Sequence, residues 1–171
     1  MVKQTTDVLT ANQIRGNLSN HPATCKYFEG VFALDELPTY YLTRRPCLVV
    51  CNTAFSKSSG EHWVGFFLSE NQVEFFDSYG MPPSNKSFAN FIATNGGDGM
   101  HFNPYSLQGL TSTTCGKYVT TYLLCRSLGI SSEMYVNEVG GGDDNVRELY
   151  EKSFGCNYHK CVGQTCRPRG I

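Results

Sequence analysis

Three short apolar runs in the middle of the chain constrain its fold more than any other feature. They are residues 47–51, 62–68 and 72–76, and each is rich in the β-branched and aromatic residues that favour strands. The connections 52–61 and 69–71 are shorter than the crossover that two neighbouring parallel strands require. The three runs are therefore predicted to form antiparallel strands of one sheet.

The short turn between the second and third runs predicts which residues face each other. We take residues 70–71 as a two-residue turn. Val64 then lies opposite Asp77, and His62 lies on the same face of the sheet. A carboxylate beside an imidazole fixes its tautomer and stabilises the imidazolium, as a catalytic base requires. The alternative is a strand-end histidine and a turn-forming aspartate with no shared role.

A second group of candidate residues surrounds the start of a helix predicted over residues 115–128. Cys115 begins this helix and follows a polar loop rich in serine and threonine. The positive end of a helix dipole favours thiolate over thiol, and unpaired backbone N–H groups there can stabilise an oxyanion. Gln108, upstream in the same loop, can add a second donor to that oxygen. The alternative is that Cys115 is a small apolar residue at the start of a core helix, as we expect for Cys125 within it.

Capping residues, helical spacing and glycine stops predict the elements around these strands. The predicted helices cover about residues 10–18, 84–95, 115–128 and 144–155, with Thr10, Ser84 and Asp144 as N-caps. Residues 100–106 are expected to form a short strand. The alternation in residues 27–37 is too irregular to predict a strand.

The composition fits one domain with its own core. The chain has 171 residues, of which 40% are apolar and 13% aromatic, and this excludes disorder of the whole chain. A net charge of −1 with 17% charged residues excludes nucleic-acid binding by overall charge, but not by a local basic patch. We predict a single domain over residues 1–155 and a basic, cysteine-rich tail over residues 156–171.

No apolar stretch reaches the length of a membrane span, and residues 1–7 lack the apolar core of a secretory signal. We therefore expect an intracellular protein that is not secreted and does not contact a membrane. A reducing compartment follows from that expectation. In it the eight cysteines are expected to be free, catalytic or metal-bound rather than paired in disulfides.

The order His62-Trp63, Asp77, Gln108, Cys115-Gly116 resembles the cysteine endopeptidases of the adenovirus protease (adenain) group, which share a core with the ubiquitin-like-protein proteases. The resemblance covers roughly residues 25–130, with a weaker similarity in the helix at 144–154. Three segments add to it: residues 29–35, residues 47–54, and residues 76–80, where a Phe-Glu/Asp-x-Phe-Gly pattern is usual in the group.

This resemblance implies an α+β cysteine-protease fold with a central, mostly antiparallel sheet flanked by helices and the nucleophile at a helix N-terminus. It implies that Cys115 is the nucleophile and that His62 is first the general base and then the acid for the leaving amine. Asp77 would orient His62, and Gln108 with the backbone N–H of Cys115 would form the oxyanion hole. Trp63 would pack beside the site or serve only as a core aromatic residue.

The resemblance also implies a biological role. The expected function is maturation of capsid or core precursor proteins of a double-stranded DNA virus or a virus-like transposon, in the host nucleus or cytoplasm and in the virion. We expect a monomer that needs no metal or other cofactor for the chemistry. Two alternatives stay open: a protease that acts on ubiquitin-like modifiers through the same site, and an inactive peptide- or DNA-binding module on the same fold.

The end of the chain is basic and rich in cysteine. Residues 152–171 contain four basic side chains and no acidic one: Lys152, Lys160, Arg167 and Arg169. They also contain four possible metal ligands: Cys156, His159, Cys161 and Cys166. This spacing fits no standard zinc pattern, so no metal site is predicted. Because proteases of the resembled type are activated by a basic, cysteine-bearing peptide and by DNA, the tail is a candidate for a similar role within the same chain.

Overall fold

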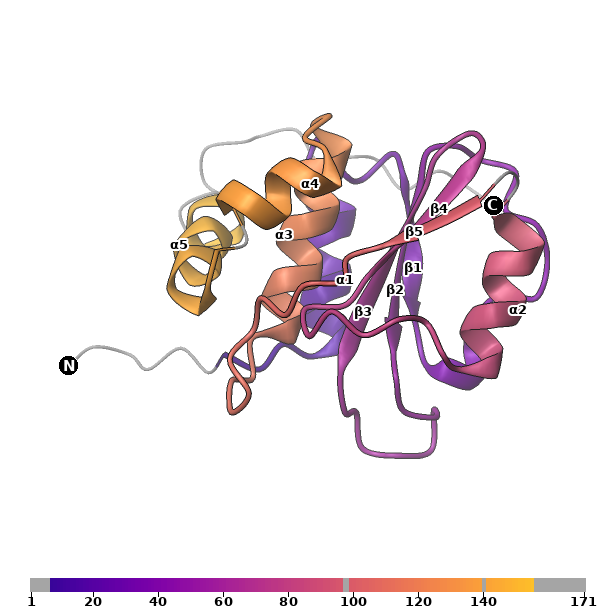
Figure 1. Cartoon of the computed structure of the whole chain (residues 1–171), viewed down its shortest axis with the longest axis horizontal. Coiled ribbons are helices and arrows are strands. Elements are labelled where there is room, and N and C mark those ends of the chain that lie inside the picture. The colour runs from indigo at the N-terminus through magenta and orange to yellow at the C-terminus, as the bar shows by residue number, and fades with distance from the viewer. Residues whose placement is uncertain (1–6, 97–98, 140, 156–171) are drawn as a thin grey trace.

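The computed structural model describes residues 7–96, 99–139 and 141–155. A single sheet with strand order β1-β2-β3-β4-β5 forms the centre of this part of the chain (Figure 1). The strands are β1 Phe28–Phe32, β2 Cys47–Asn52, β3 Trp63–Leu68, β4 Gln72–Phe76 and β5 Gly99–Phe102.

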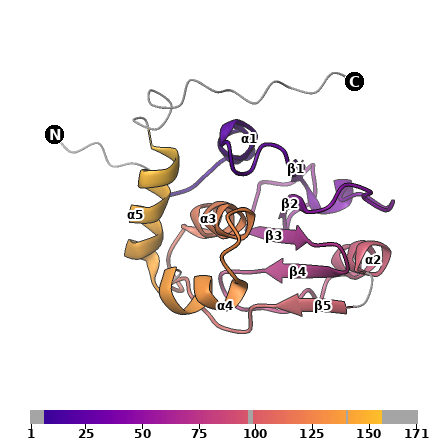
Figure 2. The same ribbon diagram turned by 90° about the horizontal axis from the view of Figure 1, so that it is seen from above.

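Helices cover both faces of the sheet. They are α1 Ala11–Asn20, α2 Lys86–Asn95, α3 Cys115–Ser127, α4 Ser132–Met134 and α5 Asp143–Phe154, with a 3₁₀ turn at Leu34–Glu36 and a π turn at Tyr135–Val139. Helices α1, α3 and α5 lie on one side and α2 on the other (Figure 1), while α4 lies near β5 (Figure 2). The predicted α+β class, with a sheet flanked by helices, is confirmed.

The register of the central strands agrees with the sequence analysis. Strand β3 pairs antiparallel with both β2 and β4, and in the second pair Gly65 faces Phe76 and Leu68 faces Val73. The backbone N–H of Ser69 donates to the carbonyl of Gln72 at 3.0 Å, which closes the turn between β3 and β4. The two-residue turn and the parity that places His62 and Asp77 on one face are therefore confirmed.

The two outer pairings are parallel, which the sequence did not indicate. Strand β1 pairs with β2, and β5 pairs with β4, in the parallel sense. Strand β1 lies in the segment 27–37, for which no strand was predicted. A register irregularity between Phe28 and Gly30 interrupts its pairing, and such a bulge removes the strict alternation by which a strand is recognised.

The helix starts differ from the predictions in two places. Thr10 caps α1 as predicted, with its hydroxyl accepting from the backbone N–H of Gln13. Helix α2 is capped by Asn85 and not by Ser84. Asp144 is not an N-cap, because α5 begins one residue earlier after Gly142, and its carboxylate instead binds Arg147 at 2.8 Å.

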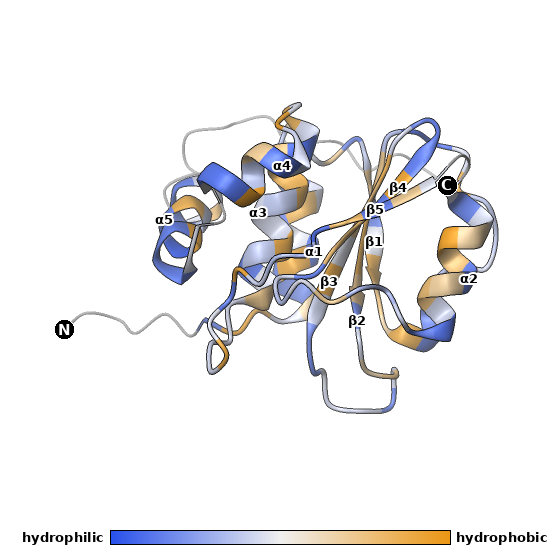
Figure 3. Cartoon of the chain, viewed as in Figure 1, coloured by the Kyte–Doolittle hydropathy of each residue, from blue (hydrophilic) through white to orange (hydrophobic). Residues whose placement is uncertain are grey.

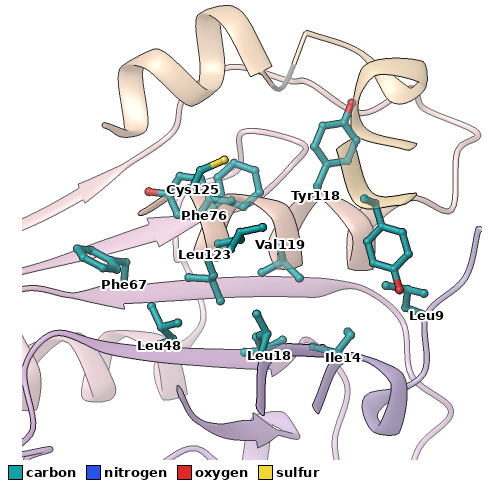
Figure 4. Packing of buried hydrophobic residues seen from close by; sticks show 14 of the residues in the cluster. Leu9, Ile14, Leu18, Leu48, Phe67, Phe76, Tyr118, Val119, Leu123 and Cys125 are labelled. Atoms are coloured by element: carbon teal, nitrogen blue, oxygen red, sulfur yellow. The ribbon is translucent and has the colours of Figure 1, made fainter. Parts of the chain in front are cut away.

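Two apolar clusters fill the spaces between the layers. The larger one lies between the sheet and helices α1, α3 and α5, and Figure 4 shows Leu18 of α1 and Val119 of α3 among its side chains. The smaller one packs α2 against the other face, with Phe66 in contact with Phe88 and Phe91. The outer side of α5 is hydrophilic (Figure 3). Helix α3 is thus held between the sheet and helices α1 and α5, and this packing fixes the position of its first residue.

The five cysteines within the described residues divide into two groups. Cys47, Cys51, Cys115 and Cys125 carry free thiols. Cys25 is disulfide-bonded, so the expectation that no cysteine is paired was wrong for this residue. Pairing depends on which thiols the fold brings within bonding distance, and the sequence spacing does not show this.

Among the described residues, no helix is long and apolar enough to cross a bilayer. The same part of the chain contains no group of three or more histidine, cysteine or acidic side chains arranged to hold a metal ion. Residues 156–171, and with them the predicted domain boundary, Cys156, His159, Cys161 and Cys166, lie outside the described residues.

The contact between β3 and α3 leads to a prediction about stability. A Cβ atom at Gly65 would lie 2.5 Å from Cγ2 of Val119. We therefore expect Gly65→Ala to lower the free energy of unfolding by about 1–3 kcal/mol through overpacking, as measured by urea denaturation. Adding Val119→Ala to this variant should restore part of the lost stability, because it removes the clashing methyl group. Gly16→Ala in α1 is the matched control, since nothing lies within 4 Å of its new Cβ. A Gly65→Ala protein as stable as the Gly16→Ala protein would contradict the packing.

Candidate active site

The imidazole of His62 and the carboxylate of Asp77 form the first part of the site. His62 directly precedes β3 and Asp77 directly follows β4, so the antiparallel register brings them to the same end of the two strands. His62 Nε2 lies 2.9 Å from Asp77 Oδ1, and the two side chains are 16% and 9% exposed. In this semi-buried position the carboxylate accepts the Nε2 proton. Nδ1 is then the nitrogen that is not bonded to Asp77.

The turn after β4 holds the carboxylate in place. Oδ1 of Asp77 also accepts the backbone N–H of Tyr79 at 2.8 Å, and the Asp77 carbonyl accepts the N–H of Gly80 at 2.9 Å. Gly80 has a φ of 72°, and a Cβ there would lie 2.6 Å from the carbonyl carbon of Tyr105. Glycine is therefore required at this position, both for its backbone conformation and for the close approach.

The thiol of Cys115 forms the second part of the site. Cys115 is the first residue of α3 and is partly exposed. The next residue, Gly116, allows the helix to approach its neighbours, because a Cβ there would lie 2.8 Å from Cβ of Leu9 and 3.3 Å from Cδ1 of Trp63. Trp63 also donates from Nε1 to the carbonyl of Leu9 at 2.9 Å. The indole thus positions the segment before α1 against the start of α3.

His62 and Cys115 shift each other's protonation in opposite directions. Burial by itself lowers the pKa of His62, but hydrogen bonds to Asp77 and Cys115 outweigh it and raise this pKa to about 9. Burial by itself raises the pKa of the Cys115 thiol. The hydrogen bond with His62 and backbone N–H groups of Trp63 and Gly116 outweigh burial and hold this pKa below its usual value. These shifts favour a thiolate–imidazolium pair.

The pKa values of the other described free thiols are shifted in the opposite direction. Burial raises the pKa of Cys47 and Cys51 to about 12 and that of Cys125 to about 11. Among the described free cysteines, the lowered pKa is therefore specific to Cys115. Because the thiolate is the nucleophilic form, the structure favours reaction at this thiol.

Gln108 is buried beside these residues, and its amide is fully hydrogen-bonded. Its Oε1 accepts from the hydroxyl of Ser78 at 2.6 Å. Its Nε2 donates to the carbonyl of Ser112 at 2.7 Å and to the hydroxyl of Tyr79 at 3.2 Å. These partners fix which end of the amide carries the protons and hold the side chain at the start of the loop that leads to Cys115.

Three of the four predicted residues border one cleft of about 680 Å³, and the fourth, Asp77, is the hydrogen-bond partner of His62. His62, Gln108 and Cys115 line it together with Trp63 and Tyr79. The cleft extends toward Val8, before α1, and Phe55, between β2 and β3, which are both exposed. The arrangement brings together a thiol, an imidazole and a carboxylate that orients the imidazole, in a concave surface large enough for several residues of a peptide.

Two further residues of the site, Tyr79 and Ser112, were not predicted from the sequence. The ring of Tyr79 lies 4.9 Å from the His62 ring at an interplanar angle of 31°. Ser112 contributes its carbonyl to Gln108 and a hydroxyl contact to Thr114 at 2.6 Å. The sequence shows that Tyr79 closely follows Asp77 and that Ser112 closely precedes Cys115. Their contacts with the site, however, form only because the fold brings together two segments that are about thirty residues apart in the chain.

Comparison with protein-family models finds no match, and comparison with curated proteins finds none. Among solved structures, the chain is similar to the crystal structure of the ASFV pS273R protease, with 23% sequence identity and a TM-score of 0.46. The match covers 64% of this chain and 45% of that chain. The chain thus spans less than half the length of that protein.

The shifted protonation of Cys115 gives a prediction that needs no substrate. Because the thiolate reacts, alkylation of Cys115 by iodoacetamide should stay fast below the pH at which an ordinary cysteine, with a pKa of about 8.5, becomes protonated. In His62→Ala the thiolate loses its partner, and the midpoint of the rate profile should move to higher pH. Mass spectrometry identifies the alkylated residue, and Cys125→Ala serves as the control. Identical midpoints in the wild-type and His62→Ala proteins would show that the two side chains are not coupled.

Proposed function

We propose that the chain is a cysteine endopeptidase that hydrolyses peptide bonds. The observation that carries the proposal is the thiol at the start of α3, which lines a cleft and is hydrogen-bonded to an imidazole that a carboxylate holds through Nε2. A structural cysteine would be buried with a raised pKa, as Cys47 is. The arrangement around Cys115 instead favours the nucleophilic form.

The geometry supports a two-step acyl transfer. Before attack Cys115 is a thiolate and its proton is on Nδ1 of His62, while Nε2–H of His62 stays bonded to Asp77. The thiolate attacks the peptide carbonyl, and the carbonyl π electrons move to its oxygen. When the tetrahedral species collapses, the C–N bond breaks and His62 gives its proton to the leaving amine. Water, deprotonated by His62, then hydrolyses the thioester and frees Cys115.

The oxyanion needs donors at the start of α3. The backbone N–H of Cys115 is one of the N–H groups that a helix leaves without an internal partner. We propose that the Gln108 side chain completes the oxyanion hole, since it lines the same cleft and its NH₂ end is fixed by Ser78 and Ser112.

We propose polypeptide precursors of capsid or core proteins as the substrates, in a double-stranded DNA virus or a virus-like transposon. The support is the order and spacing of His62-Trp63, Asp77, Gln108 and Cys115-Gly116 and the segments around them. We also propose that the protein acts as a monomer, inside the host cell and in the virion. Cleavage of a panel of precursor peptides, compared with cleavage of adducts of ubiquitin-like modifiers, tests this choice. Cleavage of modifier adducts alone would favour the alternative protease.

The catalytic assignments give an ordered set of activities. We expect Cys115→Ala to abolish peptide cleavage and Cys125→Ala to keep it, because only the first thiol has the base beside it. Asp77→Ala should lower turnover by on the order of 10²–10⁴-fold. Asp77→Asn should keep the fold but also lower turnover, because an uncharged amide favours the wrong imidazole tautomer. Steady-state kinetics with a fluorogenic peptide measures all four. An active Cys115→Ala protein would overturn the assignment.

We propose that the basic end of the chain, from Lys152 in α5 onward, modulates activity, either by binding DNA or by contacting the rest of the protease domain. Its four basic residues and three cysteines motivate this. Truncation after Gly155 should lower the rate of peptide cleavage, measured with and without DNA across a salt series. With about four phosphate contacts, the slope of log affinity against log salt should not exceed roughly −4. Equal rates for the full-length and truncated proteins under every condition would contradict any regulatory role.

A further inference from the structure

The hydroxyl of Tyr79 is a hydrogen-bond donor in the cleft that the mechanism above leaves unused. The Tyr79 ring lies against the His62 ring, and its hydroxyl reaches Nε2 of Gln108 at 3.2 Å. Tyr79, His62, Gln108 and Cys115 all line the same cleft. The phenol group therefore lines the cleft next to the imidazole that is hydrogen-bonded to the Cys115 thiol.

Both protons of the Gln108 amide are already used within the protein. The hydroxyl of Ser78 donates to Oε1 and so fixes the orientation of the amide, in which Nε2 carries the two protons. One Nε2 proton goes to the carbonyl of Ser112 at 2.7 Å, and the other goes to the hydroxyl of Tyr79. Gln108 can reach a substrate oxygen directly only by giving up one of these bonds.

The proton of the Tyr79 hydroxyl is much less committed. Its acceptor within the described residues is the carbonyl of Ser112 at 3.5 Å, which is longer than the 2.5–3.0 Å of a good O–H···O bond. That carbonyl already accepts the shorter bond from Gln108. Burial and the nearby charge of Cys115 raise the pKa of Tyr79, so its hydroxyl stays a donor when the thiolate is present.

We propose that Tyr79 is a catalytic residue whose O–H, oriented by Gln108, donates the second hydrogen bond to the oxyanion beside the backbone N–H of Cys115. The inference rests on the proposed peptidase function and refines the role of Gln108, which becomes a positioning residue. Tyr79 transfers no proton in this scheme. The Sγ–C bond forms as the carbonyl electrons move to oxygen, the Tyr79 O–H stabilises that oxygen, and the proton for the leaving amine comes from His62.

Tyr79→Phe isolates the hydroxyl, because phenylalanine keeps the ring that lies against His62. We expect a roughly 10- to 1,000-fold loss that falls on kcat, with KM unchanged, because the bond forms only as charge develops on the oxygen. A peptide aldehyde, whose thiol adduct carries the oxyanion, should bind more weakly by a similar factor. The corresponding peptide alcohol, which forms no adduct, should bind equally well to both proteins.

Two controls separate this role from a structural one. The rate of alkylation of Cys115 should be the same in the wild-type and Tyr79→Phe proteins, because alkylation forms no oxyanion. Tyr105→Phe changes an exposed tyrosine and should leave kcat unchanged. If Gln108 acts only through Tyr79, the double variant Tyr79→Phe/Gln108→Leu should be no slower than Tyr79→Phe alone. Multiplied losses in the double variant would overturn the orienting role of Gln108.

A Tyr79→Phe protein with wild-type or faster turnover would overturn the inference, because Gln108 would then donate directly once its competing acceptor is removed. This outcome leaves the proposed function intact, since cleavage still depends on Cys115. Absence of Cys115-dependent cleavage in the wild-type protein would instead overturn the proposed function and the inference together. Where Gln108→Leu does not fold, as judged by circular dichroism, the kinetics and aldehyde binding of Tyr79→Phe decide the matter.

Discussion

The bidentate ion pair between Arg126 and Glu74 fixes α3 on the sheet, and the geometry of the site depends on that docking. Arg126 Nε and a terminal guanidinium nitrogen each lie 2.7 Å from a different oxygen of Glu74, and the hydroxyl of Tyr122 adds a third bond at 2.8 Å. The ring of Tyr122 stacks on Phe76 at 4.1 Å. These contacts hold the C-terminal half of α3 against β4. Because the helix is rigid, its first residue is then directed to the end of the strands where β4 stops and the His62–Asp77 pair lies.

Helix α5 holds the residue before Cys115 and the segment before α1 in place. Asp143 accepts from the hydroxyl of Thr114, the residue before Cys115, at 3.0 Å. Asp7 binds Arg147 of α5 at 2.9 Å and the nearly buried ammonium of Lys117 at 3.0 Å. A buried cation without its partner is strongly destabilising, so this pairing fixes the segment before α1 beside the start of α3. Helix α5 therefore supports the site without contributing a reacting group.

The sequence could predict the parts of the site that depend on local rules. The turn at residues 70–71 sets the β3–β4 register, and that register places His62 beside Asp77. The helical spacing after residue 115 places Cys115 at a helix start. The role of Tyr79 could not be predicted, because it depends on the turn after β4 meeting the loop before α3. Strand β1 was missed because its pairing is irregular between Phe28 and Gly30.

The fold also explains why one thiol among several is chemically distinct. The cysteines of β2 and the interior of α3 lie where burial disfavours the charged form. Cys115 meets the same burial but also a helix N-terminus and the imidazole of His62. With the pKa of the thiol lowered and that of His62 raised to about 9, the ion pair is lost at low pH when the thiolate is protonated, and at high pH when the imidazolium loses its proton. Asp77 helps to set the upper limit of the pH range in which the ion pair exists, because its carboxylate stabilises the imidazolium. The helix start and the surrounding N–H groups help to set the lower pH limit, because they stabilise the thiolate.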